Sequence, residues 1–168
     1  RLGVVAVPVH LPIGAEGEFI GVVDLLRMRA LTWARDDASE PVQVSEIPAE
    51  LLAEAQAARA RLVEAVVEHD DAALEAWLRG EEPSVEMLLQ SIRVGVRKRS
   101  FVPVLAGSAF RNRGVEPLLD AVVDWLPAPG EREGVDSAGD DAPLSALAFK
   151  VAGDEHVKAN YSACSFTC

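Results

Sequence analysis

The segment at residues 107–110, Gly-Ser-Ala-Phe, has the residue types of a loop that could bind a flat polar ligand. It follows the apolar run FVPVLAG at residues 101–107 and precedes a helical pattern. Short continuous apolar runs are typical of buried parallel strands, and loops at the carboxyl ends of such strands line the crevice where α/β proteins bind ligands. Small side chains let backbone amides approach a ligand closely. A Gly-Ser-Ala tripeptide alone is nevertheless common in ordinary turns.

Other candidate groups for catalysis or metal binding are weaker. The pairs Asp70-Asp71 and Glu81-Glu82 could be drawn as the carboxylates of a hydrolase, but adjacent side chains point apart, so we expect cap or loop residues. Three residues near the end of the chain offer only three metal ligands and no second cysteine pair, which makes a zinc site improbable; these are His156, Cys164 and Cys168. His10 and His69 are expected to be ordinary surface or turn histidines.

No phosphate-cradling loop of the form G-x-x-x-x-G-K-[ST] occurs in the sequence. Phosphoryl transfer needs such a loop together with ligands for magnesium. We therefore expect that the chain by itself does not hydrolyse a nucleoside triphosphate.

The elements that position these residues follow from periodicity. An apolar segment at residues 4–13, interrupted by Pro8 and Pro12, predicts one short strand near a sheet edge. Residues 19–33 predict two strands or one bent strand, and Val42 with Val44 predicts a brief one. Helices are expected at 49–69, from Asp70 or Asp71 to Gly80, and at 84–98. A last helix is predicted up to Pro127, with one apolar stripe formed by Val115, Leu118, Leu119, Val122 and Leu126.

Charge is distributed unevenly along the 168 residues, whose formal net charge is -11. Residues 36–82 carry 13 acidic and 3 basic side chains, whereas residues 83–113 carry 1 acidic and 6 basic ones. An acidic block can steer a basic partner to one face, although a solvated helical face is an equally good interpretation. The sequence contains no apolar run long enough to cross a bilayer and no secretion signal, so we expect a cytoplasmic protein without a membrane partner.

Three blocks together resemble elongation factor G, a translational GTPase. They are PVHLPIGAEGEFIGVVDLLRMRALTW at residues 8–33, GSAFRNRGVEPLLDAVVDWLP at 107–127 and PLSALAFKV at 143–151. The resemblance implies an α/β fold: the C-terminal part of a P-loop-type GTPase domain with an inserted α+β subdomain. It implies an inserted subdomain at 1–100, followed at 101–127 by the last strand, loop and helix of the GTPase domain. A linker would occupy 128–143, and a truncated β-barrel domain would begin at 144–157. The tail at 158–168 matches nothing.

The same resemblance implies the site and the partners. Ser108, Ala109 and Phe110 would form the guanine-contacting loop. GTP or GDP with magnesium would bind the intact family protein, with no tight binding expected to this fragment alone. That protein hydrolyses GTP while it promotes translocation of tRNA and mRNA on the ribosome, so both RNAs would be indirect partners. The acidic helix, through Glu50, Glu54, Glu64 and Glu68, would contact the ribosomal stalk protein. The alternative is a non-catalytic interaction module that docks the stalk through this helix.

Overall fold

The computed structural model describes residues 3–34 and 41–128, and the backbone of two strands at 145–153 and 160–167. The chain divides into two compact units, one from Arg1 to Leu126 and one from Pro127 to Cys168. The first unit contains the predicted inserted subdomain and the predicted end of a GTPase domain together. The predicted linker at 128–143 lies, apart from its first residue, outside the described residues.

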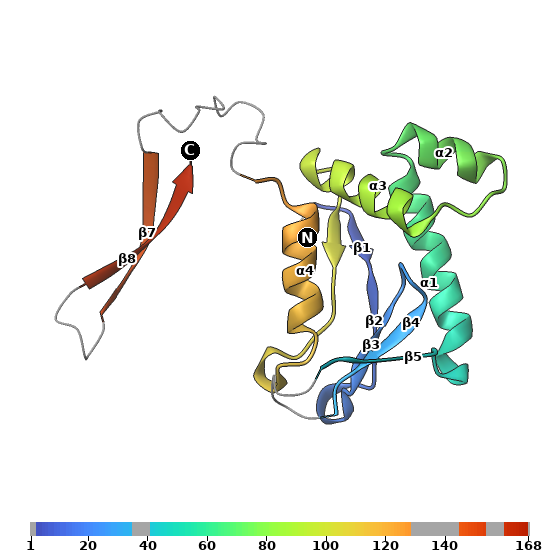
Figure 1. Ribbon diagram of the computed structural model, residues 1–168, viewed down its shortest axis with the longest axis horizontal. Helices are drawn as coiled ribbons and strands as arrows, with labels where there is room; N and C mark the ends of the chain where they lie inside the picture. The colour runs from blue at the N-terminus through green and yellow to red at the C-terminus, as the bar shows by residue number, and fades with distance from the viewer. Residues whose placement is uncertain (1–2, 35–40, 129–144, 154–159, 168) are drawn as a thin grey trace. The chain divides into compact units, whose positions relative to one another are not determined.

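The first unit has a mixed α/β fold with two sheets (Figure 1). Strand β1 (Ala6–Pro8) pairs in parallel with β6 (Val102–Val104). The second sheet is antiparallel, with the order β2-β3-β4-β5. Its strands are β2 (His10–Ile13), β3 (Gly21–Asp24), β4 (Arg29–Thr32) and β5 (Gln43–Ser45). The prediction of strands within 19–33 and around Val42 and Val44 is thus confirmed, with two strands in the first region.

The prediction of a single strand at residues 4–13 was wrong, because this segment passes from one sheet into the other at Val9. The backbone N–H of Val9 donates to the carbonyl of Val104 at 2.9 Å, which continues the parallel pairing. Its carbonyl accepts from the N–H of Leu25 at 3.0 Å, on the side of the antiparallel sheet. Val9 is buried. One residue therefore links the two sheets.

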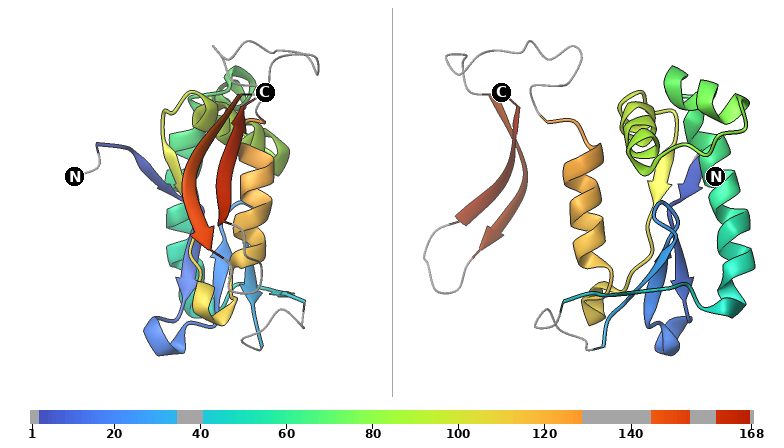
Figure 2. Two further views of the ribbon diagram at one scale, coloured as in Figure 1. Left: turned by 90° about the vertical axis from the view of Figure 1, so that its left-hand side faces the viewer. Right: turned by 45° about the vertical axis from the view of Figure 1, so that its right-hand side comes forward.

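The described residues of the first unit also form four α-helices: α1 (Ala49–Val67), α2 (Asp71–Leu78), α3 (Val85–Arg97) and α4 (Val115–Trp125). The predicted starts are confirmed by their caps. The Asp70 carboxylate accepts from the N–H of Ala73 at 3.0 Å, and the Ser84 hydroxyl accepts from the N–H of Met87 at 3.2 Å. Helices α1 and α4 lie on opposite sides of the strands, as Figures 1 and 2 show.

The core consists of one large cluster and one small one. Val23 and Leu25 belong to the large cluster, together with residues of α1 and α3 such as Leu62 and Leu88. Val22 belongs instead to the small cluster, with Phe19, Leu31 and Trp33. Successive side chains of a strand point to opposite faces, so β3 contributes to both clusters and all four of its residues are buried.

Strand β6 and helix α4 are much less buried than their sequences predicted. The parallel pairing of β6 is confirmed, but Val102 and Val104 are 48% and 42% exposed, because among the described residues only β1 pairs with this strand. Helix α4 buries Ala121 and Trp125. Most of its predicted apolar stripe is exposed, which corrects the prediction: Leu118, Leu119, Val122 and Leu126.

The second unit contains an antiparallel pair, β7 (Ser145–Gly153) and β8 (Asn160–Thr167), with an irregularity between Ala148 and Lys150. The predicted strand after the linker is therefore present. The tail that matched nothing provides its partner strand. His156 and Cys168 lie outside the described residues, and only the backbone of Cys164 is described.

Candidate functional site

The predicted ligand loop leaves the carboxyl end of β6 and returns to the start of α4. Its neck is closed by two backbone hydrogen bonds between Ser108 and Arg113, with N–H to carbonyl distances of 2.8 and 3.0 Å. Between them, the single-turn 3-10 helix η2 (Ala109–Arg111) forms the tip. The predicted strand, loop and helix therefore occur in the predicted order, with the loop where α/β folds place ligand crevices.

Two glycines allow the neck of this loop to close. A Cβ atom on Gly107 would lie 2.9 Å from the carbonyl oxygen of Arg113. On Gly114 it would lie 2.9 Å from the carbonyl oxygen of Ala106, and the φ of Gly114 is +81°. Residues that carry a side chain rarely adopt this left-handed backbone conformation. The sequence at these two positions thus fixes the shape of the loop.

The three predicted site residues lie together at the tip. Ala109 is exposed, Phe110 is 100% exposed and Ser108 is half-buried. The first N–H groups of a helix have no partner within it, and among the described residues no acceptor meets the N–H of Ala109 or Phe110. The Ser108 side chain makes no cap hydrogen bond. The tip therefore presents two backbone donors, a hydroxyl and an aromatic ring to solvent.

Two arginines attach the loop to the antiparallel sheet. The Nη1 atom of Arg111 donates to the carbonyl of Gly17 at 2.8 Å. The guanidinium of Arg113 donates to the carbonyl of Phe19. Both acceptors lie in or next to the short 3-10 helix η1 (Glu16–Glu18), between β2 and β3. The sequence did not predict these two hydrogen bonds. Any residue type can supply the backbone carbonyl that accepts them, so the acceptor positions show no characteristic residue.

The predicted partner-binding residues form a separate surface on α1. Glu50, Glu54, Glu64 and Glu68 are all exposed. With 3.6 residues per turn, their directions around the helix axis span about 80°, so they form one stripe. Among the described residues none of the four makes an ion pair. Arg61 lies in the same stripe and reduces its net charge.

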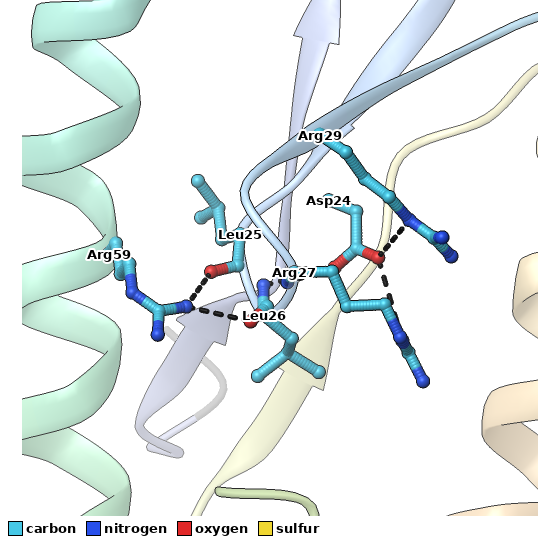
Figure 3. A network of polar contacts seen from close by, with 6 residues as sticks. All are labelled: Asp24, Leu25, Leu26, Arg27, Arg29 and Arg59. Atoms are coloured by element: carbon cyan, nitrogen blue, oxygen red, sulfur yellow. Dashed lines mark hydrogen bonds and ion pairs between the residues drawn. The ribbon is translucent and has the colours of Figure 1, made fainter. Parts of the chain in front are cut away.

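A polar network that the sequence did not predict holds the turn between β3 and β4 (Figure 3). The buried Asp24 accepts from the N–H groups of Leu26 and Arg27 at 3.0 and 3.2 Å. Its other oxygen lies 3.5 Å from Arg27 Nη1 and 3.4 Å from Arg29 Nε. From α1, Arg59 donates to the carbonyls of Leu25 and Leu26 at 2.6 and 2.8 Å. The network stabilises the turn and ties it to α1.

His10 lies opposite Asp24 in the register of β2 and β3 and is only 7% exposed, so its prediction as a surface or turn histidine was wrong. Burial lowers its pKa, because the charged imidazolium is poorly solvated there. Asp24 and a hydrogen bond to the backbone of Ala106 act in the opposite direction. His10 thus lies next to Ala106, the residue immediately before the loop at 107–114.

The acidic pairs have structural partners. Asp70 caps α2, Glu81 pairs with Arg79, and the Glu82 carboxylate lies 2.7 Å from Arg59. Within the described part of the chain, no group of three histidine, cysteine or acidic side chains is placed to hold a metal ion. The described helices include none that is long and apolar enough to span a bilayer.

No family model matches this chain. A solved structure of similar fold is the protein ttk003000868 from Thermus thermophilus, with a TM-score of 0.73 and 31% sequence identity. The match covers 96% of this chain but 23% of that protein. The chain is thus similar, over nearly its whole length, to a part that makes up about a quarter of that longer bacterial protein.

Proposed function

We propose that this chain is part of a ribosome-dependent translation elongation GTPase resembling elongation factor G. In this proposal it contains the guanine-contacting loop of the GTPase domain and an inserted subdomain. The observation that carries the proposal is the loop at residues 107–114, whose exposed tip follows a parallel strand and leaves the N–H groups of Ala109 and Phe110 available. The three sequence blocks that resemble the family include this loop.

The chemistry of the tip suits the edge of a guanine base. The base presents a carbonyl oxygen and ring nitrogens that accept hydrogen bonds. The two backbone N–H groups are uncharged donors that can bond to such acceptors. Each neutral hydrogen bond contributes about 0.5–1.5 kcal/mol net. The phosphates and magnesium would be held by residues outside this chain, because the chain has no phosphate loop. The chain would therefore supply base contacts and not hydrolysis.

The exposed apolar surface on β6 and α4 supports a larger parent domain. Val102, Val104, Leu118 and Val122 are each more than two-fifths exposed and line or flank one apolar groove. Contiguous exposed apolar surface marks a face that normally meets another part of a protein. Parallel sheets are covered on both faces, so further strands beside β6 would bury it.

The acidic stripe of α1 is the proposed contact for the ribosomal stalk protein, with the ribosome as the larger partner and tRNA and mRNA engaged indirectly. Its four glutamates are exposed and available for a basic surface. A non-catalytic module that docks the stalk through this stripe is the alternative function. The two proposals share the contact and differ in whether a nucleotide binds.

The first test is to sequence the coding region on both sides of residues 1–168. A phosphate loop and an N-K-x-D element in frame before Arg1 are expected. The encoded protein should bind GDP, and bulky substitutions such as Ala109→Leu should raise the Kd for GDP much more than the Kd for the ribosome. Absence of these elements from the reading frame would exclude catalysis and leave the interaction module. Equal effects on both affinities would indicate misfolding.

A further inference from the structure

The candidate loop is supported by residues almost a hundred positions earlier in the sequence. Arg111 donates to the Gly17 carbonyl and Arg113 to the Phe19 carbonyl, and each pair is separated by 94 residues. Figures 1 and 2 show the two short 3-10 turns at the same end of the first unit. The loop therefore rests on the antiparallel sheet as well as on its own strand and helix.

The two arginines directly follow the residues that would contact a base. Arg113 forms both backbone hydrogen bonds with Ser108, so a displacement of Arg113 would move Ser108 as well. Arg111 ends the turn that begins at Ala109. Both side chains extend from the backbone of the loop to its support and leave the tip uncovered. Phe110, which immediately precedes Arg111, is fully exposed.

The support is attached to the core through Phe19. Phe19 is buried with Val22, Leu31 and Trp33, and Ala106 packs against the same cluster. Gly14, with φ +80°, begins the η1 segment, and a Cβ atom there would lie 2.1 Å from the Glu18 carbonyl oxygen. Hydrogen bonds from a charged donor are shorter and stronger than neutral ones. Two of them to the segment between β2 and β3 restrict the conformations that an exposed loop would otherwise sample.

We infer that Arg111 and Arg113 are positioning residues for the guanine-contacting loop, which they hold against the turn between β2 and β3. This inference rests on the proposed function, which identifies the loop as the one that contacts guanine. It assigns the antiparallel sheet, and so the inserted subdomain, an indirect part in guanine recognition. Neither arginine touches the nucleotide in this assignment. Each acts through Ser108, Ala109 and Phe110.

The first experiment measures amide hydrogen exchange in the chain of residues 1–168. Arg111→Met and Arg113→Met, singly and together, retain the aliphatic stem and remove the charged donors. The amides of Ser108 and Asn112, whose N–H groups are hydrogen-bonded within the loop, should exchange about tenfold faster in the double variant, since a charge-assisted bond exceeds the 1.4 kcal/mol that corresponds to tenfold. Amides in α1 should be unchanged. Arg113→Lys should partly restore protection.

The matched control is Arg79→Met, which removes an exposed arginine paired with Glu75 and Glu81 on α2. Its loop exchange should equal that of the wild type. If the double variant also exchanges like the wild type at Ser108 and Asn112, the positioning inference is wrong. If exchange rises throughout the first unit, the arginines have only a general stabilising role.

The second experiment measures GDP binding by the longer protein encoded around this segment. The double variant should bind GDP about tenfold more weakly at an unchanged thermal midpoint, and the Arg79→Met protein should bind normally. If the wild type binds no GDP, the proposed function fails and loop exchange alone decides whether the arginines position the loop. If the wild type and the double variant bind GDP equally, the role in guanine recognition is excluded.

Discussion

Strands β3 and β6 each contain two valines, but the surroundings of these valines are very different. All four residues of β3 are buried between β2 and β4 and between two side-chain clusters, whereas two of the three residues of β6 are exposed. The difference arises from partners and not from composition. β3 has a neighbour on each edge, and β6 has one, β1, among the described strands. The valines of β6 are thus exposed apolar surface, which a larger domain would cover under the proposed function.

The largest expected effect on stability comes from truncating a leucine next to β3, compared with a leucine on α4. Leu25→Ala removes a fully buried side chain next to β3 and should lower the free energy of unfolding by about 2–5 kcal/mol. Leu119→Ala, on the exposed side of α4, should change it by less than about 0.5 kcal/mol. Urea unfolding of the chain measures both. Equal losses would show that α4 is buried and would invalidate the comparison.

The second prediction tests a closely packed point of the β6 and α4 region. Gly114→Ala places a Cβ atom 2.9 Å from the Ala106 carbonyl at a positive φ, and this contact should destabilise the chain by about 1–3 kcal/mol beyond the conformational penalty alone. Gly80→Ala is the control, because its φ of +79° is similar but no atom lies within 4 Å of the added carbon. Its cost should stay near the conformational penalty of about 1–2 kcal/mol. A Gly114 variant as stable as the Gly80 variant would mean that the loop neck is open.

The third prediction concerns His10, which is buried in the antiparallel sheet opposite Asp24. Its pKa is lowered in the folded chain, so the unfolded chain binds the proton more readily. Stability should fall as the pH drops below the ordinary value of about 6.5, by at most about 1.4 kcal/mol per pH unit. His10→Gln should remove this part of the slope. Parallel pH curves for the two proteins would contradict the assignment.

The smallest effect on stability is expected at the acidic stripe. Replacing Glu50, Glu54, Glu64 and Glu68 by glutamine should change the unfolding free energy by less than about 0.5 kcal/mol, because exposed charges without ion pairs contribute little. Binding to the stalk protein, however, should weaken severalfold and lose much of its salt dependence. Titrations at two ionic strengths measure this. Unchanged stalk binding would exclude the stripe as the contact.

Local patterns in the sequence predicted the helices and the strand, loop and helix around Ser108. The caps at Asp70 and Ser84 are short-range features, and so is the apolar period of α1. What the sequence did not predict depends on distant partners. The change of sheet at Val9 requires Val104 and Leu25 on its two sides, and the burial of His10 requires Asp24 and Ala106. The exposed side of α4 could not be predicted because its periodicity is the same whether or not a neighbour covers it.

The pairing of β1 with β6 also sets an order of events during synthesis. Ala6 pairs with Val102, so 96 residues separate the two partners. At about 5–20 residues per second, the ribosome needs about 5–20 s to make the intervening segment. The antiparallel sheet and α1 can form in this interval, while the apolar edge around Val5 and Val7 still lacks its partner strand. A nascent chain of this design is most exposed to aggregation, and most in need of a chaperone, until β6 has left the ribosome.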